Sequence, residues 1–254
     1  MKKIIESNNF YTFSKFTNNC CELEFFRGFR LSTIIVVEGI LELKILNNNK
    51  KFFIHKDQAI ILTPDVDIEV LNSKFKLFET SSLVNNKPII EIIDNKGERS
   101  EKIINDYKIN TKPKKVNKPW GYEIWFSWFK HHHALKKIHM TKGNKCSLQF
   151  HRFKFETNFI VKGRAKVLKD IMLKANLNEA EALEEYNKIN NFDSYLSNAE
   201  NGFYWTNVPN EIHRVFSIND YTAYETSTTE LDDVTRLIDD NNRISGLILS
   251  EHSE

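Results

Sequence analysis

The sequence predicts an all-β protein built from two tandem domains. Short runs of β-branched and aromatic residues alternate with polar turns, and the same rhythm occurs once in each half of the chain. Phe occurs 19 times, against 8 Gly and 5 Pro, which favours strands with aromatic packing. The 254 residues accommodate one large or two small domains, and the 41% hydrophobic fraction is sufficient for a packed core.

The first half of the chain predicts an antiparallel sandwich or a small barrel. Its strands follow one another at about 8 to 12 residues with no helical pattern between them, which is typical of these architectures. Gly39, Pro64 and the run Asn47 to Asn49 supply turns. The clearest predicted strands are residues 31–37, 40–46, 51–55, 59–62, 68–71 and 75–79.

A charged, turn-prone segment separates the halves. We expect a short helix at residues 98–107, followed by an exposed connection, TKPKKVNKP, with two prolines and four lysines. The prediction is therefore a first domain at 1–95, a linker at 96–118 and a second domain at 119–254. Strands in the second domain are predicted at 122–129, 134–140, 146–151, 158–161, 165–168, 203–208, 214–217 and 221–226.

One stretch of the second domain breaks the strand rhythm. Residues 176–190 (NLNEAEALEEYNKIN) are rich in Ala, Leu and Glu and show no strand alternation, so they predict a helical insertion between two strands. The sequence leaves open whether this insertion is a lid or a packing element.

Composition narrows the function classes. The 36 basic and 34 acidic residues give a net charge of +2, so nucleic acid is not the expected partner. Apolar runs fall far short of the roughly 18 residues of a membrane span, and the polar N-terminus lacks a signal-peptide core. Three cysteines, with Cys20 and Cys21 adjacent, cannot form a disulfide framework. We expect a soluble cytoplasmic protein.

The segment SLQFHRFKFETNFIVKG contains the clearest chemical pattern. Gln149 and His151 are two apart, so an extended strand points both to one face, and Glu156 follows after a short turn. About fifty residues later, VPNEIHRVF places His213 after a turn at Pro209, from which it could return to the same interior. Two imidazoles, a carboxylate and an amide oxygen suit a divalent metal, with zinc first and Fe, Mn, Co or Ni as alternatives.

This spacing resembles the two motifs of the cupin superfamily, and Gln in place of the first motif histidine resembles type II phosphomannose isomerases. The similarity extends to the C-terminal domain of bifunctional mannose-1-phosphate guanylyltransferases and covers about residues 118–243. The blocks that carry it are KPWGYE (118–123), KKIHMTKGNKCSLQFH (136–151), GRAKV (163–167) and LDDVTRLIDDNNR (231–243).

The resemblance implies two tandem cupin jelly-roll domains and the interconversion of aldose and ketose hexose 6-phosphates. By position, Arg236 corresponds to an arginine near the substrate, and Lys136 and Lys137 to a basic pair on the strand before the metal motif. The resemblance identifies no general base: Lys136, Lys137, His139 and Glu211 are all candidates. Departures at Phe153, Phe155, Glu211 and Asn242, with the insertion near Asn176, bear on the substrate more than on the metal.

The first half resembles a degenerate cupin. Gly39 occupies the place of Gly163, but Ser32 stands at the position of Glu156. Arg27 matches His151, and Ile68 matches His213. We therefore expect no metal in this half.

Three functional hypotheses remain at this level. The first is a metal-dependent sugar-phosphate isomerase that stabilises an enediolate. The second is other metal-cupin chemistry, such as an epimerase, lyase or dioxygenase, because fold does not fix reaction. The third is a non-catalytic sugar-binding protein. The expected partner is a small sugar phosphate, with no nucleic acid and no membrane, and a homodimer is plausible. The run His131 to His133 predicts a hairpin turn rather than metal ligands.

Overall fold

The computed structural model describes residues 2–18, 24–25, 30–64, 66–71, 74–84, 89–93, 99–103, 106–230 and 232–248. Cys20, Cys21 and Arg27 lie outside these ranges. The described chain divides into two compact units. Unit 1 contains residues 1–93, 99–114 and 125–136, and unit 2 contains 115–124 and the chain from 137 onward.

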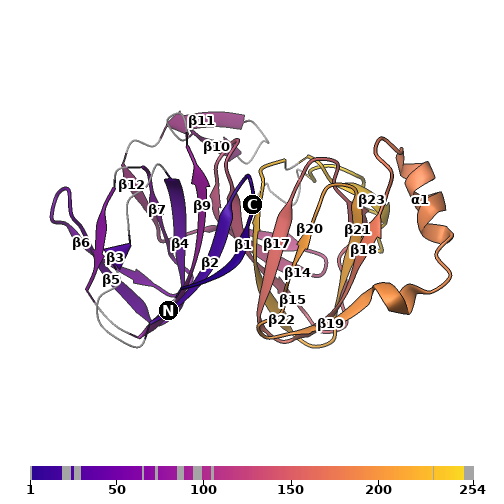
Figure 1. The fold of residues 1–254 in the computed structure, drawn as a ribbon, viewed down its shortest axis with the longest axis horizontal. Helices are drawn as coiled ribbons and strands as arrows, with labels where there is room; N and C mark the ends of the chain where they lie inside the picture. The colour runs from indigo at the N-terminus through magenta and orange to yellow at the C-terminus, as the bar shows by residue number, and fades with distance from the viewer. Residues whose placement is uncertain are drawn as a thin grey trace. The chain divides into compact units, whose positions relative to one another are not determined.

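Two sheets of unit 1 form the first barrel (Figure 1). One has the described strand order β1-β2-β9-β4-β7-β12, and the other has the order β3-β8-β5-β6. Strands β10 and β11 pair separately as a two-stranded sheet. The bounds are β1 Lys2–Ser7, β2 Thr12–Asn18, β3 Glu24–Phe25, β4 Arg30–Glu38, β5 Ile40–Ile45, β6 Lys51–His55, β7 Ala59–Leu62, β8 Ile68–Val70, β9 Phe75–Leu83, β10 Ile89–Ile93, β11 Arg99–Ile103 and β12 Tyr107–Asn110.

The interior of the first barrel is apolar. Alternate residues of β4, β5, β7, β8 and β9 point inward from both sheets, as the two-residue period of a strand requires. At about 1.5 to 3 kcal/mol per fully buried large aliphatic or aromatic side chain, this cluster is the main stabilising term of the unit. Its buried members are Phe16, Ile34, Val36, Leu41, Leu43, Ile45, Ile54, Ile60, Leu62, Ile68, Val70, Phe75 and Leu77.

The outer face of β4 and β9 is covered by a hairpin tip, residues 125–136, that comes from the start of the second half of the sequence. His133 on this tip is fully buried. Its Nε2 lies 3.0 Å from Thr33 Oγ1, and its Nδ1 lies 2.9 Å from Ser82 Oγ. Because the Thr33 hydroxyl donates to Ser127 Oγ at 2.9 Å, it accepts from His133, and Nε2 of the imidazole carries a proton. Burial lowers the pKa of His133 to about 3.

Unit 2 contains most of a second barrel. Its two sheets have the described orders β13-β14-β15-β22-β17-β20 and β19-β18-β21-β16-β23. The bounds are β13 Lys114–Lys118, β14 Gly121–Trp128, β15 Ala134–Met140, β16 Leu148–Phe150, β17 Glu156–Lys162, β18 Arg164–Met172, β19 Leu196–Glu200, β20 Tyr204–Asn207, β21 Glu211–Ser217, β22 Tyr221–Ser227 and β23 Thr235–Ile238, with helix α1 at Glu179–Asn187 and the 3-10 helix η1 at Phe192–Tyr195.

Helix α1 packs on the outer face of the five-stranded sheet. A capping box starts it: Asn178 Oδ1 accepts from Glu181 N at 3.0 Å, and Glu181 Oε2 accepts from Asn178 N at 2.8 Å. Its Ala182 lies in one cluster with Phe150 of β16 and Ile212 of β21. The helix lies beside β18, β21 and β23 (Figure 1). The insertion predicted at 176–190 is thus a helix, and it serves as a packing element for the sheet that carries β16.

The all-β class is confirmed, and every predicted strand overlaps a described strand. The short helix expected at 98–107 is wrong, because residues 99–103 form β11 and pair with β10. Residues 96–118, predicted as a linker, also contain β12, which pairs with β7, and all of β13. No helix among the described residues is long and apolar enough to cross a membrane.

Candidate metal centre

Strand β16 presents two of the predicted ligands to the barrel interior. Gln149 and His151 point inward, while Phe150 between them packs in the cluster beneath α1. The side chain of His151 is buried, and its Nδ1 contacts the backbone carbonyl of Asp233. A carbonyl only accepts hydrogen bonds, so the proton of His151 is on Nδ1 and the lone pair of Nε2 faces the interior.

His213 of β21 arrives in the same orientation. It pairs directly with Gln149 across the sheet, so their side chains share one face. His213 Nδ1 donates to the carbonyl of Glu211 at 3.0 Å, which leaves the Nε2 lone pair facing inward. The Glu211 carboxylate itself accepts from the backbone N–H groups of Asp170 at 2.7 Å and Val208 at 3.0 Å. Glu211 therefore holds the local backbone, which argues against the role of general base considered for it.

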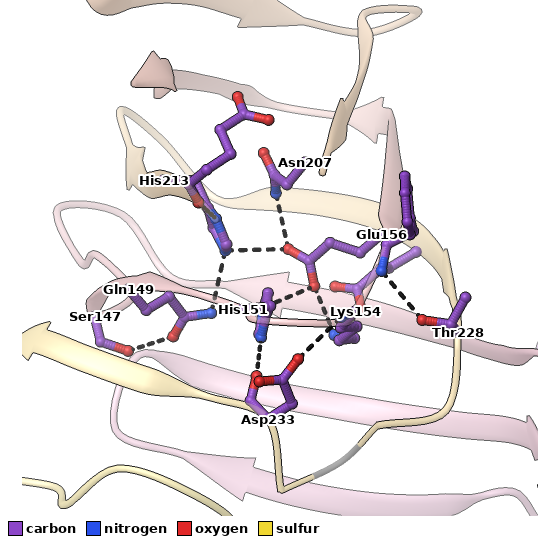
Figure 2. Close-up of polar contacts among 12 residues, drawn as sticks. Ser147, Gln149, His151, Lys154, Glu156, Asn207, His213, Thr228 and Asp233 are labelled. Carbon is purple, nitrogen blue, oxygen red and sulfur yellow. Dashed lines mark hydrogen bonds and ion pairs between the residues drawn. The ribbon is translucent and has the colours of Figure 1, made fainter. Parts of the chain in front are cut away.

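Glu156 enters from the opposite sheet, at the start of β17. Its Oε1 lies 3.2 Å from His213 Nε2, and its Oε2 lies 3.5 Å from His151 Nε2 (Figure 2). Ligand atoms of these three buried residues all lie within 4.8 Å of one another.

The turn after β17 requires glycine: Gly163 has φ +87°, and a Cβ there would lie 2.1 Å from the carbonyl oxygen of Asp220.

The fit of a cation follows from the donors and acceptors in this cluster. An imidazole lone pair and a carboxylate oxygen repel unless a proton or a cation lies between them. Burial, followed by the nearby Lys154 ammonium, lowers the pKa of His151, which favours its neutral form. His151 Nε2 is buried without a hydrogen-bond partner. A single divalent ion would satisfy both imidazoles and the carboxylate at once, and this donor set suits such ions.

Gln149 lies beside His213, but its amide nitrogen faces the imidazole. Its Nε2 lies 3.3 Å from His213 Nε2, and its Oε1 accepts from Ser147 Oγ at 2.7 Å. To offer an oxygen to a metal ion, the amide must rotate by half a turn about its last side-chain bond. The predicted fourth ligand is therefore next to the cluster, and its role as a ligand stays a prediction.

A buried lysine beside the cluster was missed by the sequence analysis. Lys154 Nζ lies 2.6 Å from Glu156 Oε2 (Figure 2). It also lies 3.2 Å from Glu225 Oε1. Burial would lower its pKa, but the two carboxylates raise it above the usual value, so Lys154 is an ammonium. Asn207 Nδ2 donates to Glu156 Oε1 at 2.8 Å. Lys154 and Asn207 thus each donate to one oxygen of Glu156, and together they hold the carboxylate in an orientation that faces both imidazoles.

The pKa shifts of this network favour an ionised Glu156 and a cationic Lys154. Burial would raise the pKa of Glu156, but Lys154 and then His151 hold it well below the usual value. Burial likewise would lower the pKa of His213, but its hydrogen bond and charge interaction with Glu156 raise it. With Lys154 cationic and Glu156 ionised, the interior carries a partly compensated carboxylate before any ion binds.

Arg236 lies on β23, in register with Gln149. Since Gln149 is also in register with His213, the three side chains form a row on the inward face of the five-stranded sheet. The guanidinium is engaged by the chain itself: Arg236 Nη1 donates to the carbonyls of Ile244 and Gly246.

The lysine pair predicted from the resemblance lies on β15. Lys136 is buried, with Nζ 5.2 Å from the centroid of the Trp125 ring, and Lys137 is half-buried. This difference agrees with strand alternation, which predicts that only one of the two looks inward. His139, another candidate base, stacks on Tyr122 and lies 3.2 Å from Thr222 Oγ1 through Nδ1. The catalytic roles of Lys136, Lys137 and Arg236 remain predictions.

Comparison with solved structures identifies the fold. The oxalate decarboxylase of Lactobacillus farciminis, in a formate complex, is 10% identical with a TM-score of 0.57, covering 91% of this chain and 80% of its own. Procruciferin, an 11S globulin of Brassica napus, is 9% identical with a TM-score of 0.60, covering 93% and 80%. The pirin YhhW of Escherichia coli, in complex with nickel(II), is 8% identical with a TM-score of 0.53, covering 86% and 81%. No family model and no curated protein matches the sequence.

The chain therefore has the cupin fold, with two tandem jelly-roll domains as predicted. At these identities the likeness defines the fold alone. These structures of one fold include an oxalate decarboxylase, an 11S globulin and a nickel-bound pirin, so the chemistry must be argued from the residues of the second barrel.

Proposed function

We propose that this protein is a metal-dependent enzyme whose second barrel binds a divalent cation through His151, Glu156 and His213, with Gln149 as a further ligand. The observation that carries the proposal is the buried Nε2 of His151, which has no hydrogen-bond partner and faces a carboxylate and a second imidazole. Zinc is the first candidate for the ion, and Fe, Mn, Co and Ni suit the same donors.

The chain supports such an ion with residues of its own. A divalent cation at this place would polarise an oxygen of a bound small molecule and stabilise negative charge on it. His151 and His213 present Nε2 because two backbone carbonyls hold their Nδ1–H groups. Lys154 and Asn207 fix the Glu156 carboxylate, and Lys154 also partly balances its charge.

For the reaction, we propose aldose-ketose isomerisation of a sugar phosphate of the mannose 6-phosphate type. The motif blocks of the sequence support this proposal, and so does the row of Arg236, Gln149 and His213 on one face of the sheet. A guanidinium at the end of that row suits a phosphate or a developing oxyanion. The partner proposed here is accordingly a small phosphorylated sugar. Cytoplasmic residence and a homodimer stay predictions.

A second candidate is another metal-cupin reaction, such as that of an epimerase, lyase or dioxygenase. It is favoured by the position of Glu211, a candidate isomerase base whose carboxylate is held by two backbone N–H groups. Among solved structures of the same fold, one is an oxalate decarboxylase and another is a pirin in complex with nickel(II). A non-catalytic sugar-binding role is the third reading.

The test separates these readings in two steps. Elemental analysis of the purified protein, before and after chelation and reconstitution, measures the bound metal. Proton exchange at C2 of mannose or fructose 6-phosphate is then followed in deuterated buffer. Metal with exchange supports the isomerase, and metal without exchange supports the second candidate. Absence of any metal after reconstitution would overturn the metal-dependent function.

A further inference from the structure

Asp233, just before β23, contacts the turn between His151 and Glu156 through both its carboxylate and its backbone carbonyl. Its Oδ1 accepts from the backbone N–H of Arg152 at 2.9 Å. Its Oδ2 accepts from the N–H groups of Phe153 at 2.6 Å and Lys154 at 2.9 Å. Its backbone carbonyl is the group that takes the Nδ1–H of His151 (Figure 2).

These contacts connect one residue to several parts of the centre. Three successive N–H groups converging on one carboxylate fix the backbone of residues 152–154, which otherwise would leave donors without partners. That turn links His151 to Glu156 and carries Lys154. The carbonyl of the same residue sets which nitrogen of His151 faces the interior. A shift of Asp233 therefore moves the ring of His151 and the turn together.

The second histidine is held by the same device. His213 Nδ1 donates to the carbonyl of Glu211, and the Glu211 carboxylate accepts from the backbone N–H groups of Asp170 and Val208. Each imidazole is thus oriented by the carbonyl of an acidic residue whose own carboxylate is fixed by neighbouring backbone. The same arrangement occurs at both His151 and His213, which indicates that it serves the histidines, because a turn alone needs only the carboxylate.

We infer that Asp233 and Glu211 are paired positioning residues of the metal centre, acting through the two histidines rather than on a substrate. This inference rests on the proposed metal site. Asp233 has the larger effect, because its carboxylate accepts three N–H groups and holds the turn between two ligands, whereas that of Glu211 accepts two. Outer partners of this kind typically contribute about 10- to 100-fold to metal affinity.

The experiment measures Co²⁺ and Zn²⁺ affinity and the Co²⁺ absorption spectrum of the full chain. We expect Asp233→Ala to weaken both affinities by about 10- to 100-fold and to change the Co²⁺ spectrum, and Glu211→Ala to do so by less. In the metal-free protein, Asp233→Ala should also speed amide hydrogen exchange at residues 152–154. Asp232→Ala and Glu200→Ala, at exposed acidic positions, are the matched controls and should leave affinity and spectrum unchanged.

The outcomes separate this inference from the function on which it rests. Wild-type protein that binds neither ion overturns both. Wild-type binding with unchanged affinity and spectrum in Asp233→Ala overturns the positioning role alone, even if that variant unfolds more easily. Should Asp233→Ala fail to fold, Asp233→Asn replaces it, because one oxygen still accepts from the turn. An affinity loss in Asp233→Asn above that of the controls supports the role, and wild-type affinity rejects it.

Discussion

The two barrels share the same strand pairing but differ in the side chains that fill their interiors: the first has an apolar cluster where the second has the His and Glu group. In the first, Ser32 of β4 pairs with Leu62 of β7 and Ser81 of β9, and in the second, Glu156 of β17 pairs with Asn207 of β20 and Ser227 of β22. The glycine after each of these strands is also equivalent. Gly39 and Gly163 have φ of +83° and +87°, and a Cβ at either would lie 2.5 or 2.1 Å from a carbonyl oxygen.

The side chains inside differ where the backbones agree. The positions of Asn158 and Asn207 in the second barrel are taken by Ile34 and Leu62 in the first, where both belong to a continuous apolar cluster. The first barrel shows that this scaffold folds well around aliphatic residues. Burying carboxylates, imidazoles and an ammonium is costly by comparison. If the proposed metal centre holds, the polar side chains of the second barrel serve chemistry rather than stability.

The largest expected effect follows from removing one imidazole. His213→Ala should abolish metal binding, because it removes a ligand and leaves Glu156 facing a gap, while the fold persists. The equivalent change in the first barrel, Ile68→Ala, should leave metal content intact but lower the free energy of unfolding by about 2–5 kcal/mol. Metal analysis and denaturant unfolding of both variants measure the contrast. Metal retained by His213→Ala would contradict the ligand assignment.

A second prediction concerns the buried ammonium. Lys154→Met should lower the free energy of unfolding of the metal-free protein by about 3–5 kcal/mol, because Glu156 and Glu225 lose their shared counter-charge. Added Zn²⁺ should recover part of this loss, because binding to the folded state adds stability by mass action. Leu41→Met inside the first barrel is the control and should cost less than about 1.5 kcal/mol. An unchanged unfolding midpoint for Lys154→Met would show that the ion pairs contribute nothing net.

Periodicity and spacing predicted much of this architecture. Gln149 and His151 were predicted as ligands because a strand puts every second residue on one face, and Glu156 and His213 because turns could return the chain to the same interior. The helix at 179–187 was predicted because the segment is rich in Ala, Leu and Glu, which favour helix, and lacks the alternation of polar and apolar residues typical of a strand. These signals are local, so one sequence is enough to read them.

The elements that were missed depend on long-range contacts. Residues 107–110 look like a charged linker, and they become a strand because β7 offers an edge to pair with. Lys154 falls in the short turn before Glu156, and only the fold brings Glu225 to it from a strand 71 residues away. Asp233 lies in the block 231–243 of the resemblance, but its contacts are with backbone groups, which no residue pattern reveals.

The buried imidazole of unit 1 supplies a third prediction, this time with pH as the variable. The pKa of His133 is lowered from 6.5 to about 3, so the folded state resists protonation while the unfolded state accepts it. The stability from the neutral ring is complete above pH 6.5 and is lost as the pH falls toward 3. At 1.36 kcal/mol per pH unit, we expect a loss of about 2 kcal/mol at pH 5.

Urea unfolding at pH 7.5 and pH 5 measures how much the free energy of unfolding falls on acidification, and this fall is compared between the wild type and two variants. His133→Gln should show a smaller loss on acidification than the wild type, because its side chain cannot take a proton. His55→Gln, at an exposed position of β6, should behave like the wild type. Equal pH dependence in all three proteins would mean that His133 does not couple the stability of unit 1 to pH.

The smallest expected effect on metal affinity comes from a change on β23. The five-stranded sheet of the second barrel contains this strand, whereas the corresponding sheet of the first barrel has four described strands. Arg236→Ala should change metal affinity by less than about threefold, because its guanidinium bonds to the carbonyls of Ile244 and Gly246 rather than to a ligand. If the isomerase proposal holds, KM for the sugar phosphate should rise by about tenfold or more, because a charged hydrogen bond to phosphate is lost. Arg243→Ala, whose guanidinium pairs with Asp239, controls for charge and should leave KM unchanged. A tenfold loss of metal affinity in Arg236→Ala would instead place this arginine among the supports of the centre, and the contrast between the barrels would then include β23 itself.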